Sequence, residues 1–107
     1  MDLTQFIDFD PSAASAFFDL NALAHETIFT ALLASGVVLE HYPMWTDRVS
    51  PDWLEIHYRE HQAWSSALNL AAPPDLGMVD FESDASRQAW LQNHYLHHAR
   101  VAQALSL

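Results

Sequence analysis

The hydrophobic and polar positions of this chain follow a helical spacing in three separate stretches. In each stretch, large apolar or imidazole side chains recur at steps of 4, 4, 3 and 4 residues, which places them on one side of an α-helix. The three sets are Phe17, Asn21, His25, Ile28 and Leu32; Trp53, His57, His61, Trp64 and Leu68; and Trp90, His94, His98, Val101 and Leu105. This spacing predicts helices at about 11–35, 51–69 and 84–106.

The ends of these helices carry residues that favour a helix start or stop. The dipeptides DP at 10–11 and SP at 50–51 each offer an N-cap residue followed by proline at the first helical position. Ser83 or Asp84 can cap the third helix, and Gly36 suits the end of the first. The local signals therefore agree with the spacing of the apolar positions.

The three stretches also repeat in sequence. Residues 53–70 (WLEIHYREHQAWSSALNL) and 90–107 (WLQNHYLHHARVAQALSL) are identical at eight of eighteen positions, and residues 17–34 form a fainter copy. A fixed internal period indicates repeated structural units. We predict one all-α domain over residues 1–107, a three-helix domain built from three sequence-related helical repeats. The repeats span about 1–36, 37–73 and 74–107.

The connections between the predicted helices are long. Residues 36–50 and 70–83 both contain proline and several large apolar side chains, so we expect packed segments rather than free linkers. An extended chain covers ~3.5 Å per residue and a helix rises ~1.5 Å per residue, so each connection can run back along a helix. The helices could be parallel and related by a rough threefold, or antiparallel. Similar residues precede the first and the third predicted helix, which favours three equivalent structural units.

Composition and charge narrow the functional classes. The chain has 107 residues, is 50% hydrophobic and contains no cysteine, which suits one packed domain without disulfides or thiolate metal ligands. Its formal charge is −10 and it has no lysine, so we expect no direct binding to nucleic acid. No apolar run is long enough to span a bilayer, and we expect no membrane contact. The acidic N-terminus lacks a signal pattern, which favours an intracellular origin.

Histidines on the apolar stripes raise the main chemical question. His25, His61 and His98 share one repeat position, and in a parallel bundle they would meet in one layer that could hold zinc. The neighbouring layer would contain Asn21, His57 and His94. The interpretation that we favour is structural: neutral histidines packed in the core, with no metal and no cofactor. On that interpretation a chelator leaves the melting temperature unchanged, whereas a metal-binding helical bundle is the alternative.

The sequence offers little for catalysis. The motif H-E-x-x-H is absent, no E-x-x-H pair suggests a di-iron bundle, and two glycines cannot supply a glycine-rich phosphate loop. The serines lie outside any recognisable nucleophile turn. We therefore expect no enzymatic activity.

The repeated W-L-x-x-H-x-x-x-H followed by A-L-x-L resembles small acidic helical proteins encoded among the virion genes of tailed bacteriophages. The clearest copies begin at Trp53-Leu54 and Trp90-Leu91. The resemblance implies a setting rather than a mechanism: a non-enzymatic structural or assembly protein of the virion, present in the host cytoplasm during assembly. Its expected partners are other virion proteins of the neck, tail or capsid, in a symmetric oligomeric assembly.

An aromatic loop is the candidate partner surface. Tyr42, Met44 and Trp45 lie close together in a proline-bearing connection, and such side chains are typical of interface anchors. The alternative is that Met44 and Trp45 cover one end of the bundle.

Overall fold

The computed structural model describes residues 14–46, 50–80 and 82–107. Within these ranges the chain forms three α-helices and no strand: α1 (Ala14–Ala34), α2 (Pro51–Ala67) and α3 (Asp84–Ala104). The all-α prediction is confirmed, and the three helices lie within two residues of their predicted ends wherever both ends are described. The expected helical residues 11–13 and the proposed cap at 10–11 lie outside the described part.

Local signals start and end the helices as the sequence predicts. The Ser50 side chain accepts a hydrogen bond from the backbone N–H of Trp53 at 3.1 Å, which satisfies one donor at the start of α2. Ser83, rather than Asp84, caps α3 by accepting from the backbone N–H of Ser86 at 3.2 Å. After α1, Gly36 adopts a φ of 86°, a left-handed conformation that glycine reaches without strain.

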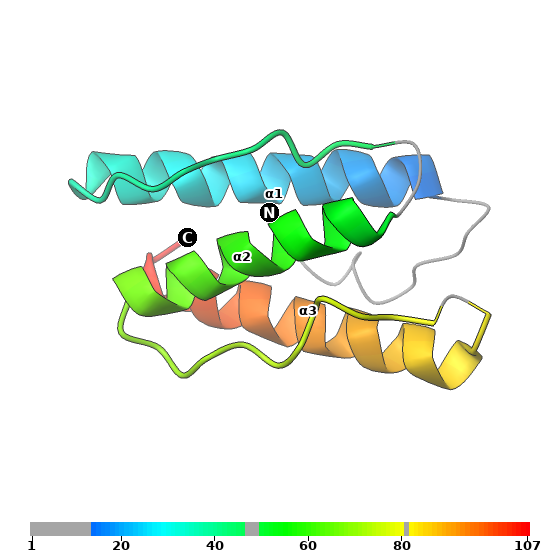
Figure 1. The fold of residues 1–107 in the computed structure, drawn as a ribbon. Helices are drawn as coiled ribbons and strands as arrows, with labels where there is room; N and C mark the ends of the chain where they lie inside the picture. The colour runs from blue at the N-terminus through cyan, green and yellow to red at the C-terminus, as the bar shows by residue number, and fades with distance from the viewer. Residues whose placement is uncertain (1–13, 47–49, 81) are drawn as a thin grey trace.

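All three helices run in the same direction (Figure 1). This is possible because residues 37–46 and 70–80 return along the bundle without helical structure and bring the chain back to the same end. We call residues 37–46 and 70–80 the returning segments. A tryptophan of the helix that follows each returning segment donates an indole hydrogen bond to a backbone carbonyl of that segment. Trp53 Nε1 donates to the Met44 carbonyl at 2.8 Å, and Trp90 Nε1 donates to the Leu76 carbonyl at 3.0 Å.

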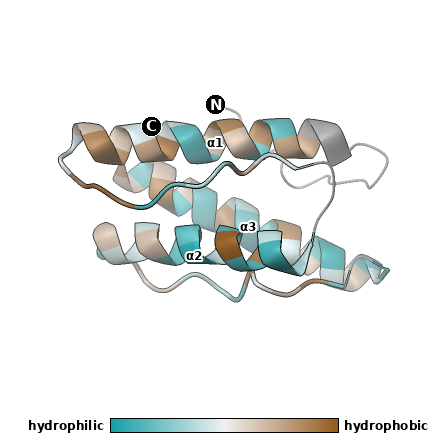
Figure 2. Ribbon diagram, turned by 45° about the horizontal axis from the view of Figure 1, so that its top comes forward, coloured by the Kyte–Doolittle hydropathy of each residue, from teal (hydrophilic) through white to brown (hydrophobic). Residues whose placement is uncertain are grey.

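The apolar core is divided into two clusters. One, around Trp53 and Trp90, lies toward the helix starts, and the other, around Trp64, lies toward the helix ends. The members of the first are Phe17, Phe18, Ala24, Trp53, Leu54, Leu76, Trp90 and Leu91, and those of the second are Ile28, Leu32, Trp64 and Val101. Hydrophilic residues interrupt the hydrophobic ones along each helix (Figure 2). Within the described ranges, no helix has the length and apolar character needed to cross a membrane.

Candidate metal centre

Five histidines fill the space between the two apolar clusters. His25 comes from α1, and α2 and α3 each contribute an i, i+4 pair, which a helix presents on one side. Each of the five is fully buried, and one ring nitrogen from each lies within 4.8 Å of all the others. The members are His25, His57, His61, His94 and His98, and we call this group the five-histidine cluster. The structure thus brings together every histidine that the sequence offered as a metal candidate.

The parallel helices produce the layer that the repeat suggested. The ring centroids of His25 and His61 are 5.0 Å apart, those of His25 and His98 are 5.0 Å apart, and those of His61 and His98 are 4.7 Å apart. His57 and His94 face each other one turn earlier, with centroids 4.8 Å apart.

Three ring nitrogens converge at the centre of the cluster. His57 Nε2 lies 3.1 Å from His94 Nε2 and 3.2 Å from His61 Nε2. A ring nitrogen of neutral histidine carries either one proton or one lone pair, so His57 Nε2 can form one good hydrogen bond but not two. Three lone pairs aimed at one cation would satisfy all three nitrogens. Tetrahedral zinc with Zn–N bonds of ~2.05 Å separates its ligand nitrogens by about 3.3 Å, close to these spacings.

Outer hydrogen bonds orient two of the rings. His25 Nδ1 donates to Glu60 Oε1 at 2.9 Å, which leaves the lone pair on Nε2; that nitrogen is buried without a hydrogen-bond partner among the described residues. His61 Nδ1 lies 2.6 Å from His97 Nδ1, and His97 Nε2 lies 2.7 Å from Ser65 Oγ. If each ring donates outward along this chain, the Nε2 lone pair of His61 faces the cluster. Metal-binding histidines commonly have such outer partners.

The protonation state of the five imidazoles suits the binding of a cation. Burial, followed by the nearby imidazoles, holds the pKa of His25, His57, His61 and His94 well below the usual value near 6.5. Burial and His97 lower the pKa of His98 to about 3. All five rings are therefore neutral at pH 7, which is the form that binds metal.

Glu60 places a carboxyl group at the edge of the cluster. Among the buried residues that the structure describes, it is the only one with a carboxyl group. Its Oε1 accepts from His25 Nδ1 at 2.9 Å and from His41 Nδ1 at 3.1 Å. Burial raises the pKa of Glu60 above its ordinary value, and the adjacent His41 opposes this shift. A carboxylate in this position is stabilised by a cation held behind His25.

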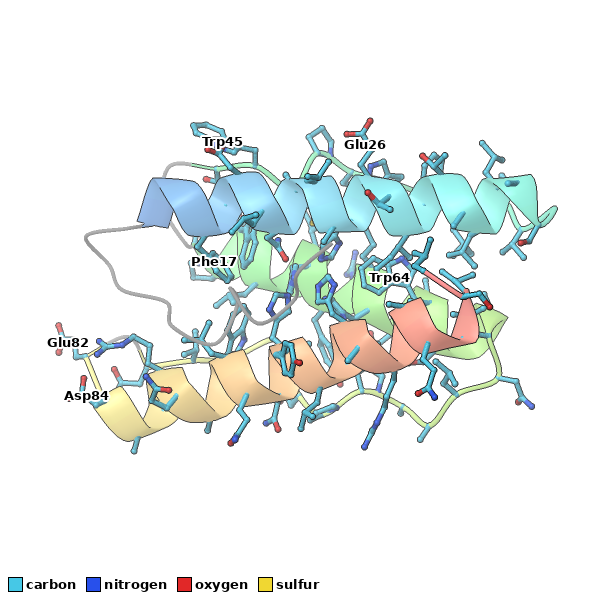
Figure 3. All side chains as sticks on the ribbon, turned by 180° about the vertical axis from the view of Figure 1, so that it is seen from behind. Phe17, Glu26, Trp45, Trp64, Glu82 and Asp84 are labelled. Atoms are coloured by element: carbon cyan, nitrogen blue, oxygen red, sulfur yellow. The ribbon has the colours of Figure 1, made fainter. Side chains whose placement is uncertain are left out.

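Indole rings enclose the cluster. Trp53 stacks on His57 with centroids 4.6 Å apart, and Trp90 stacks on His94 at 4.8 Å. The ring centroid of Trp64 lies 4.4 Å from that of His25 and 4.5 Å from that of His61. The Trp64 side chain points into the space between the helices (Figure 3). These rings restrict the imidazole orientations and exclude water from the centre.

Three contributors to this centre were missed in the sequence. Glu60, His97 and His41 lie beside the repeating stripes or outside the helices, so helical spacing does not single them out. His97 could have been found as the immediate neighbour of His98. Glu60 carried no comparable signal, because its burial depends on the returning segment that contains His41.

The candidate partner residues are placed differently from one another. Met44 is buried, and its carbonyl receives the indole N–H of Trp53. Tyr42 and Trp45 are 43% and 53% exposed, and Trp45 lies on the outer side of α1, where its Nε1 donates to Asp19 Oδ1 at 2.8 Å (Figure 3). Their role in an interface stays a prediction.

Comparison with protein-family models, curated proteins and solved structures finds no match to this chain.

Proposed function

We propose that this chain is a small metal-binding helical protein in which the five-histidine cluster holds one divalent first-row transition-metal ion. Neutral imidazole nitrogens suit Zn²⁺, Cu²⁺, Fe²⁺ and Ni²⁺ better than Mg²⁺ or Ca²⁺, which prefer oxygen ligands. Zn²⁺ is the first ion to test, because the spacing of the central nitrogens is close to that of a tetrahedral zinc site.

The observation that carries this proposal is the position of His57 Nε2, 3.1 Å from His94 Nε2 and 3.2 Å from His61 Nε2. In a purely structural layer, the single proton or single lone pair of His57 Nε2 has to serve both contacts. A metal ion removes that conflict. The hydrogen bond from His25 Nδ1 to Glu60 supports it further, because it directs the His25 Nε2 lone pair toward the same centre.

Metal binding and the structural histidine layer predict opposite responses to a chelator. We expect native mass spectrometry to show one ion per chain, and removal of the ion to lower the melting temperature. Free ion at 100 times its dissociation constant stabilises a fold by about 2.7 kcal/mol, which corresponds to roughly 10 °C for a domain of this size. A melting temperature that is the same with chelator and with Zn²⁺ would support the structural layer instead.

Variants at neighbouring positions of α2 separate a specific site from surface binding. His61→Leu removes a ligand from the centre, and we expect it to abolish binding at zinc concentrations that saturate the parent. Gln62→Leu is the matched control, because Gln62 follows His61 on α2 and its side chain is exposed. We expect the control to retain one ion per chain.

We also propose a role in virion assembly, compatible with metal binding. The exposed rings of Tyr42 and Trp45 support it, because exposed aromatic side chains are enriched at protein interfaces. On this proposal the chain docks on other virion proteins or on copies of itself, without enzymatic activity of its own.

The sequence repeat accounts for most of the histidines in the proposed metal centre. We propose that each repeat contributes one helix and one set of inward side chains. The shared W-L-x-x-H-x-x-x-H of α2 and α3 then supplies four of the five histidines, and the first repeat supplies the fifth.

A further inference from the structure

Asn21 occupies the position in α1 where α2 and α3 carry His57 and His94. Its side chain is fully buried, and neither Nδ2 nor Oδ1 has a hydrogen-bond partner among the residues that the structure describes. Burying an amide without hydrogen-bond partners is costly, and an aliphatic side chain at this position would avoid that cost. This cost points to a partner that binds from outside the chain.

The neighbours of Asn21 place it beside the five-histidine cluster. Phe17, one turn earlier on α1, lies 5.9 Å from His94 between ring centroids. His25, one turn later, lies 4.7 Å from His57. Because residues four apart share one side of a helix, Asn21 lies level with His57 and His94. Five imidazoles and one amide thus complete two layers of three.

The charge of the loaded centre favours an anionic partner. A divalent ion contributes two positive charges, the five neutral histidines contribute none, and Glu60 can contribute at most one negative charge. At least one positive charge then remains in a water-excluding interior, where an uncompensated charge is costly. A small monovalent anion on the metal would cancel it, and the Asn21 amide can donate a hydrogen bond to that anion.

We propose that the metal ion keeps one coordination position for a small monovalent anion of about one to three atoms, and that Asn21 Nδ2 donates a hydrogen bond to the bound anion. This inference rests on the proposed metal site. The complete burial of the five histidines and Asn21 limits the size of the ligand. Asn21 acts here as a ligand-binding residue, because it stands beside the ion where a sixth imidazole would otherwise lie.

The test uses the full chain loaded with Co²⁺, whose visible absorption reports its coordination, and azide as the probe anion. We expect one Co²⁺ per chain and a saturable change of the spectrum with azide. In Asn21→Ala the Co²⁺ should remain, and the azide dissociation constant should rise about tenfold or more, the value of a hydrogen bond to a charged group. Gln92→Ala, at an exposed position of α3, is the control and should match the parent.

Asn21→His provides a second and independent variant. It supplies a sixth imidazole, so we expect Co²⁺ to remain bound and the azide response to disappear. This variant also carries the test if Asn21→Ala does not fold, as judged by helical circular dichroism.

Several results would overturn the inference. The parent could bind Co²⁺ without any azide response, Asn21→Ala could bind azide as tightly as the parent, or Asn21→Ala could lose the metal itself. Azide binding retained in Asn21→His would be equally contrary. Failure of the parent to bind either Zn²⁺ or Co²⁺ would instead refute the proposed function, and it would be seen at the loading step before azide is added.

Discussion

Glu60 illustrates how a single buried residue can connect the metal centre to the rest of the fold. Its carboxylate is only 3% exposed, yet it accepts hydrogen bonds from His25 on α1 and from His41 in the segment before α2. A buried carboxylate is costly unless it is paired. The proposed ion would compensate Glu60 through the His25 ring, and Glu60 in turn would fix the tautomer that presents the His25 Nε2 lone pair.

Glu60→Gln tests this outer contact while preserving the shape of the side chain. The amide oxygen can still accept from His25 Nδ1, but the negative charge is lost. We expect the zinc dissociation constant to rise about 10–100-fold, as for other outer partners of metal-binding histidines. Competition with a chromophoric chelator measures the change. Glu55→Gln is the control, because Glu55 is exposed and pairs with Arg59; an equal change in both variants would show a general charge effect.

At the scale of elements, the segment between α1 and α2 has two sides. Met44 is buried and receives the indole N–H of Trp53, whereas Trp45 is more than half exposed and is held against α1 by Asp19. Met44 can therefore pack in the core of the bundle while the adjacent Trp45 exposes its aromatic ring at the surface. This division makes Trp45 a sharper test of an interface than Met44.

Trp45→Ala should weaken assembly more than it weakens the fold. If the ring is an interface anchor, its loss should cost more than about 1 kcal/mol of association free energy, while helical circular dichroism survives. Sedimentation of the purified chain over a range of concentrations measures its self-association. Leu96→Ala, an exposed apolar position on α3, is the control. Unfolding of the Trp45→Ala monomer would place Trp45 in the core and remove the interface proposal.

At the scale of the whole molecule, the fold encloses a polar centre between two apolar clusters. Its stability without metal depends on keeping the buried histidines neutral. Burial lowers their folded-state pKa, while the unfolded chain keeps values near ~6.5. The unfolded state therefore binds more protons in mild acid, and acid favours unfolding.

The metal-free chain should lose stability as the pH falls below about 6.5. This contribution is fully present above the unfolded pKa and declines below it; for His97 and His98 the decline ends near their folded pKa values, about 4 and about 3. Each additional proton taken up on unfolding contributes up to about 1.4 kcal/mol per pH unit. Urea unfolding with chelator from pH 7.5 to pH 5 measures the slope.

The double variant His61→Leu with His98→Leu should show a shallower pH dependence if the leucines fill the same space. A stability that does not change with pH in both the parent and the double variant would contradict the buried, neutral cluster.

Local sequence patterns were sufficient to predict the three helices and the stripe on which five histidines lie. Helix spacing and capping depend on contacts within a few residues, so the sequence identified Ser50 as a cap and limited the cap of α3 to Ser83 or Asp84. The stripe also identified His25, His61 and His98 as one layer if the helices were parallel. The repeat favoured equivalent units but left that direction open.

The parallel direction of the helices and the convergence of the ring nitrogens depend on long-range packing. The direction follows from the return paths of residues 37–46 and 70–80, whose packing involves residues distant in the sequence. Glu60 and His97 join the centre through contacts 35 and 36 residues away along the chain, with His25 and His61. Such contacts have no local period. The close approach of His57, His61 and His94 likewise depends on how α2 and α3 pack, so the geometry on which the proposed metal site rests arises only when the chain is folded.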